Sequence, residues 1–172
     1  GDLDLYVCNY LQWSPRLETR CLGFNGLRGY CSPGEYRPQP DSLYRNDGVG
    51  PDGRVTFTDV SVEAGMRSVA ASGLGVVTAD FDGDGWVDIY VANDQMPNHL
   101  WINGQDGTFR EEALIRGAAL NDLGLPEAGM GVAVEDWDDD GDWDLFVVHL
   151  TGETNTFYRN QGGAFRDITD EL

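Results

Sequence analysis

Two short acidic segments contain the residues best suited to chemistry. One runs from Asp80 to Asp88 and the other from Asp136 to Asp144, and both follow the pattern D-x-D-x-D-G-x-x-D. Carboxylates at alternate positions of a tight loop can converge on one hard cation, and calcium bonds oxygen ligands at about 2.4 Å. Magnesium demands a smaller octahedron, and zinc prefers histidine or cysteine. The spacing therefore predicts two calcium sites.

Each segment offers five expected ligands in the same order: carboxylates at positions one, three, five and nine, and the backbone carbonyl at position seven. They are Asp80, Asp82, Asp84, Trp86 and Asp88 in the first segment, and Asp136, Asp138, Asp140, Asp142 and Asp144 in the second. Gly85 and Gly141 permit the sharp turn after the third carboxylate. Asp139 replaces a glycine at the fourth position, and aspartate tolerates the left-handed backbone region better than most residues.

An EF-hand loop shares the first half of this pattern, so it is the main structural alternative. An EF-hand requires a bidentate glutamate at position 12 and a helix after the loop. Here position 12 is Val91 or Val147, within a β-branched run that indicates a strand. We expect calcium in β-hairpin loops, with an EF-hand and a merely solvated acidic turn as the other readings.

The acidic segments belong to a repeat that must position them. A marker recurs every 57 residues, as Leu43–Asn46, Leu100–Asn103 and Phe157–Asn160, and each copy precedes a Gly/Asp-rich turn and an aromatic-led strand. Gly-rich strands precede the two acidic segments, which suits a crowded wall where neighbouring units approach closely. A complete unit is thus four short strands. The predicted fold is all-β: a partial β-propeller of four-stranded antiparallel blades with calcium-binding hairpin loops.

The repeat divides the chain into three expected blades. Residues 1–60 form a partial first blade with an insert at 11–42, residues 61–116 the second blade, and residues 117–172 the third. Asp2 and Asp4 occupy positions seven and nine of an incomplete acidic loop. Closed propellers need about 4–8 blades. We therefore expect the remainder of a propeller in a longer polypeptide, or neighbouring chains, to be partners.

Charge excludes several classes of partner. The 172 residues carry a formal net charge of −19, and all 11 basic residues are arginine. Such a chain repels nucleic acid and anionic membrane surfaces and attracts cations. No apolar run approaches the roughly 18 residues that a membrane helix needs. We expect no nucleic-acid partner and no membrane span.

The cysteines and the insert suggest an extracellular surface. Cys21 and Cys31 flank a Gly/Asn/Arg-rich loop, so we expect a disulfide between them and an oxidising compartment, extracellular or periplasmic. Arg16, Arg20 and Arg28 make the insert mildly basic on an acidic body. They could bind an anionic glycan or a protein; the plainer alternative is a loop pinned by the disulfide.

Catalysis is not expected. The two histidines, His99 and His149, lie in or beside strand segments without a paired serine or cysteine nucleophile. No phosphate loop, dinucleotide fingerprint or metalloprotease motif occurs. The chain should therefore be a non-enzymatic module.

These motifs resemble the FG-GAP/VCBS repeat family of β-propellers. The segments Gly73–Val77, Tyr90–Asp94 and Gly152–Thr156 are further similar to the bacterial relatives of cartilage acidic protein, whose terminal ASPIC/UnbV segment is absent from these 172 residues. The resemblance implies a secreted or surface-exposed protein with calcium-stabilised blades. The leading hypothesis is a structural or adhesive module that binds protein or glycan; the alternative is the non-catalytic propeller of a larger secreted polysaccharide-active enzyme.

Overall fold

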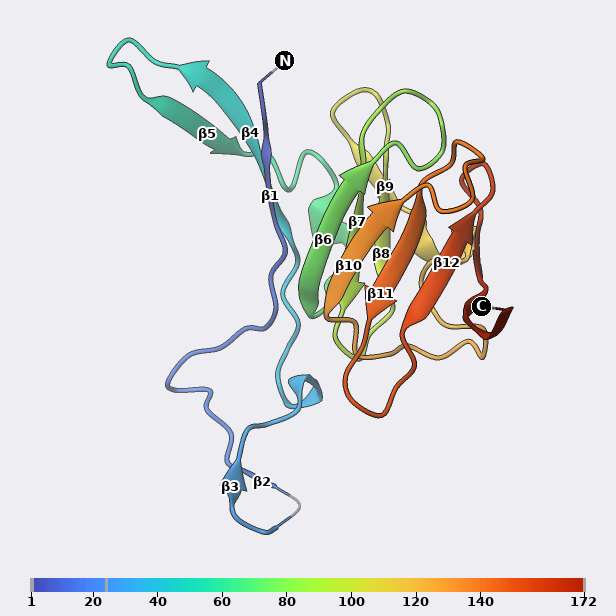
Figure 1. Cartoon of the computed structure of the whole chain (residues 1–172). Coiled ribbons are helices and arrows are strands. Elements are labelled where there is room, and N and C mark those ends of the chain that lie inside the picture. The colour runs from blue at the N-terminus through green and yellow to red at the C-terminus, as the bar shows by residue number, and fades with distance from the viewer. Residues whose placement is uncertain (1, 24, 172) are drawn as a thin grey trace.

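Three larger antiparallel sheets and one two-stranded hairpin build the part of the protein that the structure describes, a computed structural model covering residues 2–23 and 25–171 (Figure 1). The first sheet contains β1 (Leu5–Val7), β4 (Ser42–Val49) and β5 (Val55–Asp59). The second contains β6 (Gly73–Ala79), β7 (Asp88–Asn93), β8 (His99–Asn103) and β9 (Phe109–Glu111). The third contains β10 (Gly131–Glu135), β11 (Asp144–Val148), β12 (Thr156–Asn160) and β13 (Phe165–Asp167). The prediction of an all-β fold with four-stranded antiparallel sheets is confirmed.

Helical segments are short and lie in the connections. They are the 3₁₀ helices η1 (Pro33–Glu35), η2 (Met66–Ser68) and η3 (Thr169–Glu171) and the single α-helical turn α1 (Ala113–Arg116). A strand rather than a helix follows each acidic segment, since β7 begins at Asp88 and β11 at Asp144. The EF-hand reading is therefore wrong. Within the described residues, no helix is both long and apolar enough to cross a membrane.

The second and third sheets meet along their glycine-rich first strands. Figure 1 shows β6 and β10 side by side. A Cβ atom added to Gly75 would lie 2.8 Å from the Met130 carbonyl oxygen and 3.2 Å from Val132 Cγ1. Real Cβ atoms do not approach so closely, so the two backbones can meet only where a side chain is absent. The expected close approach of neighbouring units is confirmed.

The second sheet is covered on both faces. Ile89 and Val91 pack with Leu43 of the first sheet, whereas Tyr90 packs with Leu145 of the third. Because side chains alternate between the faces of a strand, every residue of β7 is buried. This double coverage fixes the strand that follows the first acidic segment.

The third sheet is covered on one face only. In β11, Leu145 and Val147 are buried, whereas Phe146 remains 38% exposed. Phe146 and Trp137 gather around Phe157 on this open face, with ring centroids 6.3 Å and 5.3 Å from the Phe157 ring. Tyr90, at the corresponding place in the second sheet, is fully buried. The outer face of the third sheet is thus an exposed aromatic surface. The corresponding face of the second sheet is covered by the third sheet.

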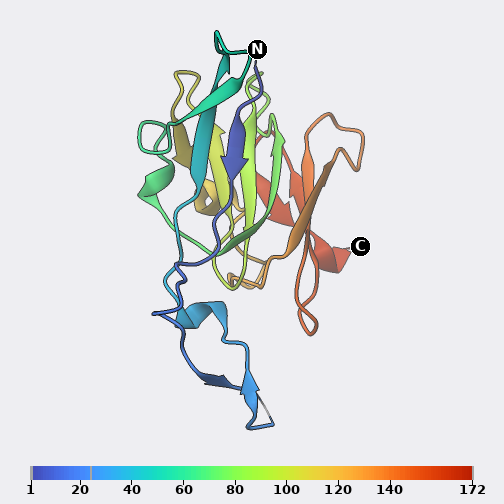
Figure 2. The same ribbon diagram turned by 90° about the vertical axis from the view of Figure 1, so that its left-hand side faces the viewer.

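The hairpin end of the insert projects away from the sheets (Figure 2). It carries the small hairpin of β2 (Cys21–Leu22) and β3 (Arg28–Gly29), and the expected disulfide joins Cys21 to Cys31. The chain re-enters the first sheet at Ser42, the final residue of the expected insert range. The insert is therefore a disulfide-bonded arm that begins and ends between β1 and β4.

Candidate metal centres

The ninth carboxylate of each acidic segment anchors its loop to the sheet. Asp88 Oδ2 accepts a hydrogen bond of 2.9 Å from the Phe81 backbone N–H, and Asp88 Oδ1 accepts one of 2.8 Å from the Asn103 N–H. Asp144 repeats this pattern with the backbone N–H groups of Trp137 and Asn160, at 3.0 and 2.7 Å. Both carboxylates are buried at the start of a strand. They are fixed points around which the rest of each loop folds.

The first carboxylate closes each loop from the other side. Asp80 accepts hydrogen bonds from the backbone N–H groups of Asp84 and Gly85, at 3.1 and 2.8 Å. Asp136 accepts the equivalent bonds from Asp140 and Gly141, at 3.1 and 3.0 Å. The nine residues therefore curl into a turn that brings its first and last carboxylates together.

Glycine and aspartate at the fourth position adopt the same unusual backbone conformation. The φ angle is 73° at Gly83 and 57° at Asp139, and Gly85 and Gly141 follow with φ of 89° and 93°. All four lie in the left-handed region, which glycine enters without the steric cost of a Cβ atom. The expected tolerance of aspartate at position 139 is confirmed.

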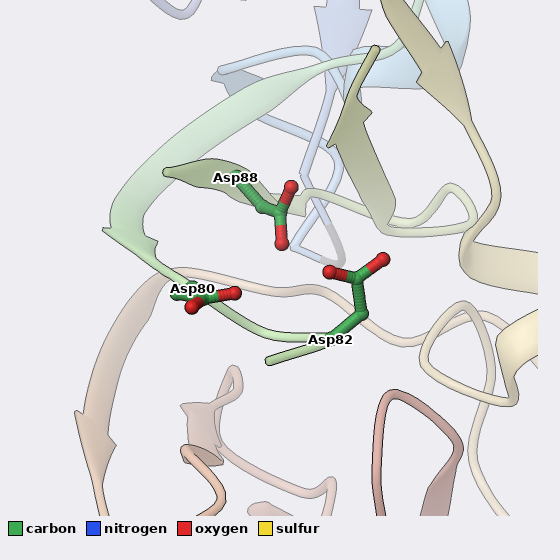
Figure 3. Close-up of side chains that lie close together, drawn as sticks. All are labelled: Asp80, Asp82 and Asp88. Carbon is green, nitrogen blue, oxygen red and sulfur yellow. The ribbon is translucent and has the colours of Figure 1, made fainter. Parts of the chain in front are cut away.

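Three carboxylates converge in each loop. Figure 3 shows Asp80, Asp82 and Asp88 facing a common space. One oxygen of each lies within 4.8 Å of the others, as do oxygens of the second set, Asp136, Asp138 and Asp144. Oxygens bound to one cation at about 2.4 Å are separated by less than about 5 Å, so this spacing fits a shared ion.

Each loop contains a buried carboxylate oxygen without a hydrogen-bond donor. Within the described residues, Asp82 Oδ1 and Asp138 Oδ1 are buried and have no hydrogen-bond partner. A buried carboxylate oxygen without a donor is costly unless a cation compensates it. An all-oxygen donor set favours calcium over zinc. The two acidic loops therefore fit a hard divalent cation.

The remaining expected ligands lie at the rim of each loop. Asp84 Oδ1 accepts from the Trp86 backbone N–H at 2.8 Å and its Oδ2 accepts from Gln105 Nε2 at 2.8 Å. Asp140 Oδ1 accepts from the Asp142 N–H at 3.0 Å. Neither Asp84 nor Asp140 belongs to its converging triad. Their ligation, and that of the Trp86 and Asp142 carbonyls, stays a prediction.

Burial and repulsion perturb the carboxylates in the direction expected of a cation site. Burial raises the pKa of Asp88 from its ordinary 3.8 to about 6, against the opposing effect of its two backbone hydrogen bonds; the charges of Asp82 and Asp84 raise it further. Desolvation also raises the pKa of Asp138, which the Arg159 guanidinium opposes. In both loops, therefore, negative charge lies close together without full compensation.

The last residue of the repeat marker holds each loop in place, a role that the sequence did not reveal. Asn103 donates from Nδ2 to the Val87 carbonyl at 3.0 Å, and Asn160 donates to the Trp143 carbonyl at 3.1 Å. Asn46 makes the same bond to the Leu3 carbonyl at 3.0 Å, and its N–H donates to Asp4 Oδ1 at 2.8 Å. The recurrence of asparagine at a fixed distance after the acidic loop was the signal available in the sequence.

Two arginines next to the loops were also missed. Arg116 donates to Asp82 Oδ2 at 3.2 Å and to the Gly163 carbonyl at 3.0 Å. Arg159 forms an ion pair with Asp138 and lies 3.4 Å from Asp140 Oδ2. Neither arginine is near its acidic loop in sequence, so only the folded chain shows the contact.

The three insert arginines are on the projecting arm and belong to neither acidic loop. Arg16, Arg20 and Arg28 are exposed on the projecting arm. Arg28 pairs with Glu18 at 2.7 Å, which offsets part of the basic charge. A glycan or protein surface on this arm stays a prediction.

Known proteins share the repeat. The FG-GAP-like repeat family matches residues 30–91 and 80–147 of the chain, which confirms the resemblance seen in the sequence. Cartilage acidic protein 1 of Xenopus tropicalis is 32% identical over 112 residues, which are 64% of this chain and 16% of that protein. The Homo sapiens protein of the same name is 29% identical over 124 residues, 70% of this chain and 17% of that protein. The chain therefore spans less than a fifth of the length of these relatives. Since the two family matches together extend over more than half of its residues, the chain belongs to the FG-GAP-like repeat family.

Proposed function

We propose that the chain is an extracellular, non-enzymatic calcium-binding module with a structural or adhesive role toward protein or glycan partners. The observation that carries this proposal is the pair of carboxylate triads, each with a buried oxygen that lacks a donor. Calcium would supply the missing positive charge and cross-link the two ends of each loop. The chain's own residues supply the rest, since backbone N–H groups already orient the first and ninth carboxylates.

In this proposal the cation contributes to blade geometry rather than to a reaction. Asp80, Asp82, Asp84 and Asp88, with the Trp86 carbonyl, would hold one ion, and the five equivalent residues of the second loop another. Asp88 is also bonded to Asn103 of β8, so an ion on this loop stabilises the β7–β8 pair. Calcium binding should therefore stiffen each sheet at the end where its loop lies.

The blades are proposed to be successive parts of one larger propeller. Residues 1–60, 61–116 and 117–172 would be three of its blades, completed by the remainder of a longer polypeptide or by neighbouring chains. The exposed aromatic face around Phe157 supports this reading, because its counterpart on the second sheet is buried against the next sheet. An extracellular location is supported by the Cys21–Cys31 disulfide, which oxidising compartments favour.

Thermal unfolding with and without calcium tests the proposal. Binding that is specific to the folded state adds about 2.7 kcal/mol per site at 100 times the dissociation constant. For a chain of this length, two such sites should raise Tm by roughly 10–20 °C. Scanning calorimetry of calcium-loaded protein, before and after EDTA, measures the shift, with magnesium as the control cation. An unchanged Tm after chelation would contradict a structural role for calcium.

The insert arginines provide a separate test of the interaction role. If they form an anionic-ligand surface, changing Arg16, Arg20 and Arg28 together to alanine should abolish capture on an array of sulfated and carboxylated glycans. Arg54→Ala removes a charge from an exposed arginine elsewhere and serves as the control. Capture that survives the triple change would leave the insert with a structural role.

A further inference from the structure

A cavity of about 300 Å³ lies where the insert meets the second sheet. Pro33, Tyr36 and Pro38 line it from the insert, and Asp94 and Met96 line it from the turn between β7 and β8. The cavity therefore places one carboxylate among largely apolar groups. It contains no residue of either acidic loop.

Asp94 is the feature of this cavity that calls for a ligand. The residue is 5% exposed, and its Oδ2 accepts a hydrogen bond of 2.6 Å from the Tyr10 hydroxyl. Within the described part of the chain, Asp94 Oδ1 is buried and has no hydrogen-bond partner, and no arginine pairs with this carboxylate. A buried carboxylate in this state is compensated best by a cationic donor from outside the chain.

The cavity wall is held by specific bonds. Gln95 has a φ of 58°, which is an uncommon conformation for a residue with a Cβ atom. Its N–H donates to the Glu127 carbonyl at 3.1 Å, and its Oε1 accepts from the Ser32 hydroxyl at 3.1 Å. These bonds connect the turn to both the insert and the next blade. The turn that carries Asp94 is therefore bonded to the insert that supplies the opposing wall.

The chemistry of the site selects a particular cation. Guanidinium groups pair best with both oxygens of a carboxylate at once, but Tyr10 already occupies one oxygen of Asp94. A compact ammonium group needs only one acceptor, and its methylene stem can pack along Tyr36, Pro38 and Met96. The chain contains no lysine of its own, and its net charge of −19 attracts basic partners.

We propose that this cavity binds a primary alkylammonium group, with the ammonium paired with the Asp94 carboxylate and the alkyl stem against the apolar wall. A lysine side chain of a partner polypeptide and a free amine share this chemistry. The site rests on the proposed interaction role of the chain but not on calcium binding. Failure of one proposal is therefore distinguishable from failure of the other.

The experiment follows the Met96 methyl group by NMR in calcium-loaded protein, with the signal assigned through Met96→Leu. The probes are the tripeptide acetyl-Gly-Lys-Gly-amide, its norleucine and arginine analogues, and n-butylamine. We expect the lysine peptide to bind at least tenfold more tightly than the norleucine analogue, as followed by the Met96 signal, because norleucine lacks the ammonium that makes a charge-assisted hydrogen bond. Tighter binding of the peptide than of butylamine identifies a lysine as the source, and the reverse order identifies a free amine.

Three variants sharpen this test. Asp94→Asn keeps the size of the side chain and should weaken lysine-peptide binding at least tenfold, whereas Asp52→Asn removes an equal charge from an exposed turn and should change nothing. Tyr10→Phe releases the second oxygen of Asp94 and should move the preference toward the arginine peptide. A circular-dichroism spectrum and thermal unfolding of Asp94→Asn report separately whether the variant is folded.

Three results would overturn the proposal. They are norleucine binding as tight as lysine binding, a Met96 signal that does not move in wild-type protein, and an Asp94→Asn variant with wild-type affinity. The first and second need no variant, so the proposal can be refuted even if Asp94→Asn fails to fold.

Discussion

The acidic loop that begins at Asp80 lies beneath a neighbouring blade, whereas the loop that begins at Asp136 lies beside an open face. Phe81, the second residue of the first loop, is 1% exposed, but Trp137 at the same position of the second is 52% exposed. Phe81 packs edge-on against Phe165 with centroids 5.9 Å apart, and its carbonyl accepts a bond of 2.8 Å from Asn160 Nδ2. Two loops with the same nine-residue pattern of aspartates thus occupy two different environments.

The arginines beside the two loops also differ in whether they contact a neighbouring blade. Arg116 reaches Asp82 while also bonding to Gly163 of the next blade, so it connects two blades across the first loop. Arg159 pairs with Asp138 and lies beside Asp140, within its own blade. The corresponding position in the second sheet is Ile102, which is buried in the core. The motif determines the backbone of a loop, and the neighbouring blade determines its exposure and its counter-charge.

The largest expected contrast concerns the marker asparagines. Asn160→Ala should lower the free energy of unfolding by about 3 kcal/mol, because it leaves the buried carbonyl of Phe81 and the Gly163 N–H without partners. Asn103→Ala removes the same bond within one blade but none across blades, and should cost about 1 kcal/mol. Urea denaturation of both variants measures the difference. Equal losses would mean that the bond between blades adds no stability.

The pH dependence of the covered loop comes next. In calcium-free protein the pKa of Asp88 is about 6, against 3.8 ordinarily, so the folded state holds this proton more tightly than the unfolded state. The resulting stabilisation is fully present below pH 3.8 and is lost as pH rises through about 6. It should be on the order of 2 kcal/mol. The difference between wild-type and Asp88→Asn unfolding free energies, measured from pH 4 to pH 7, isolates it; parallel profiles would contradict it.

A third contrast concerns the arginine beside the open loop. Arg159→Gln should raise the calcium affinity of that loop about tenfold, because the guanidinium repels the ion and competes for Asp138. Arg116→Gln should raise the affinity of the covered loop less, since its charge is shared with Glu112. Isothermal titration measures the calcium affinity of the open loop in an Asp80→Asn background and that of the covered loop in an Asp136→Asn background. A fall in affinity after Arg159→Gln would show that this arginine supports the ion.

The smallest contrast concerns the fourth loop position. Asp139→Gly should stabilise calcium-free protein by about 0.5–1 kcal/mol, because glycine relieves the cost of a Cβ atom at a φ of 57°. Gly83→Ala should destabilise by about 1 kcal/mol for the same reason; no atom lies within 4 Å of the added Cβ, so the cost comes from the backbone alone. Thermal unfolding of both variants measures the pair, and a change of the same sign in both would refute this reading.

Much of the fold could be predicted because each repeat consists of short strand-forming runs separated by turn residues. The close approach at Gly75 was predictable for the same reason, since a glycine-rich first strand indicates a crowded contact. The insert's position against the second sheet was not, because the Ser32–Gln95 bond joins residues 63 apart in sequence. No local pattern encodes a contact at that range.

The site was predictable to the same extent. Spacing indicated the three carboxylates of each triad, but it also included Asp84 and Asp140, which lie outside the triads. It indicated the left-handed conformation at Asp139 as well. Arg159 and Asn160 escaped prediction, because a repeat marker gives the position of a residue but not the partner that folding brings to it. The unpaired oxygen of Asp94 escaped for the same reason: only the folded chain shows which donors are missing.

Calcium titration of the metal-free chain tests the central claim most directly. Isothermal titration calorimetry should give two ions per chain, one ion after either Asp80→Asn or Asp136→Asn, and none after both. A chain that stays folded yet takes up no calcium at millimolar concentration, or keeps its stoichiometry in the double variant, would contradict the account.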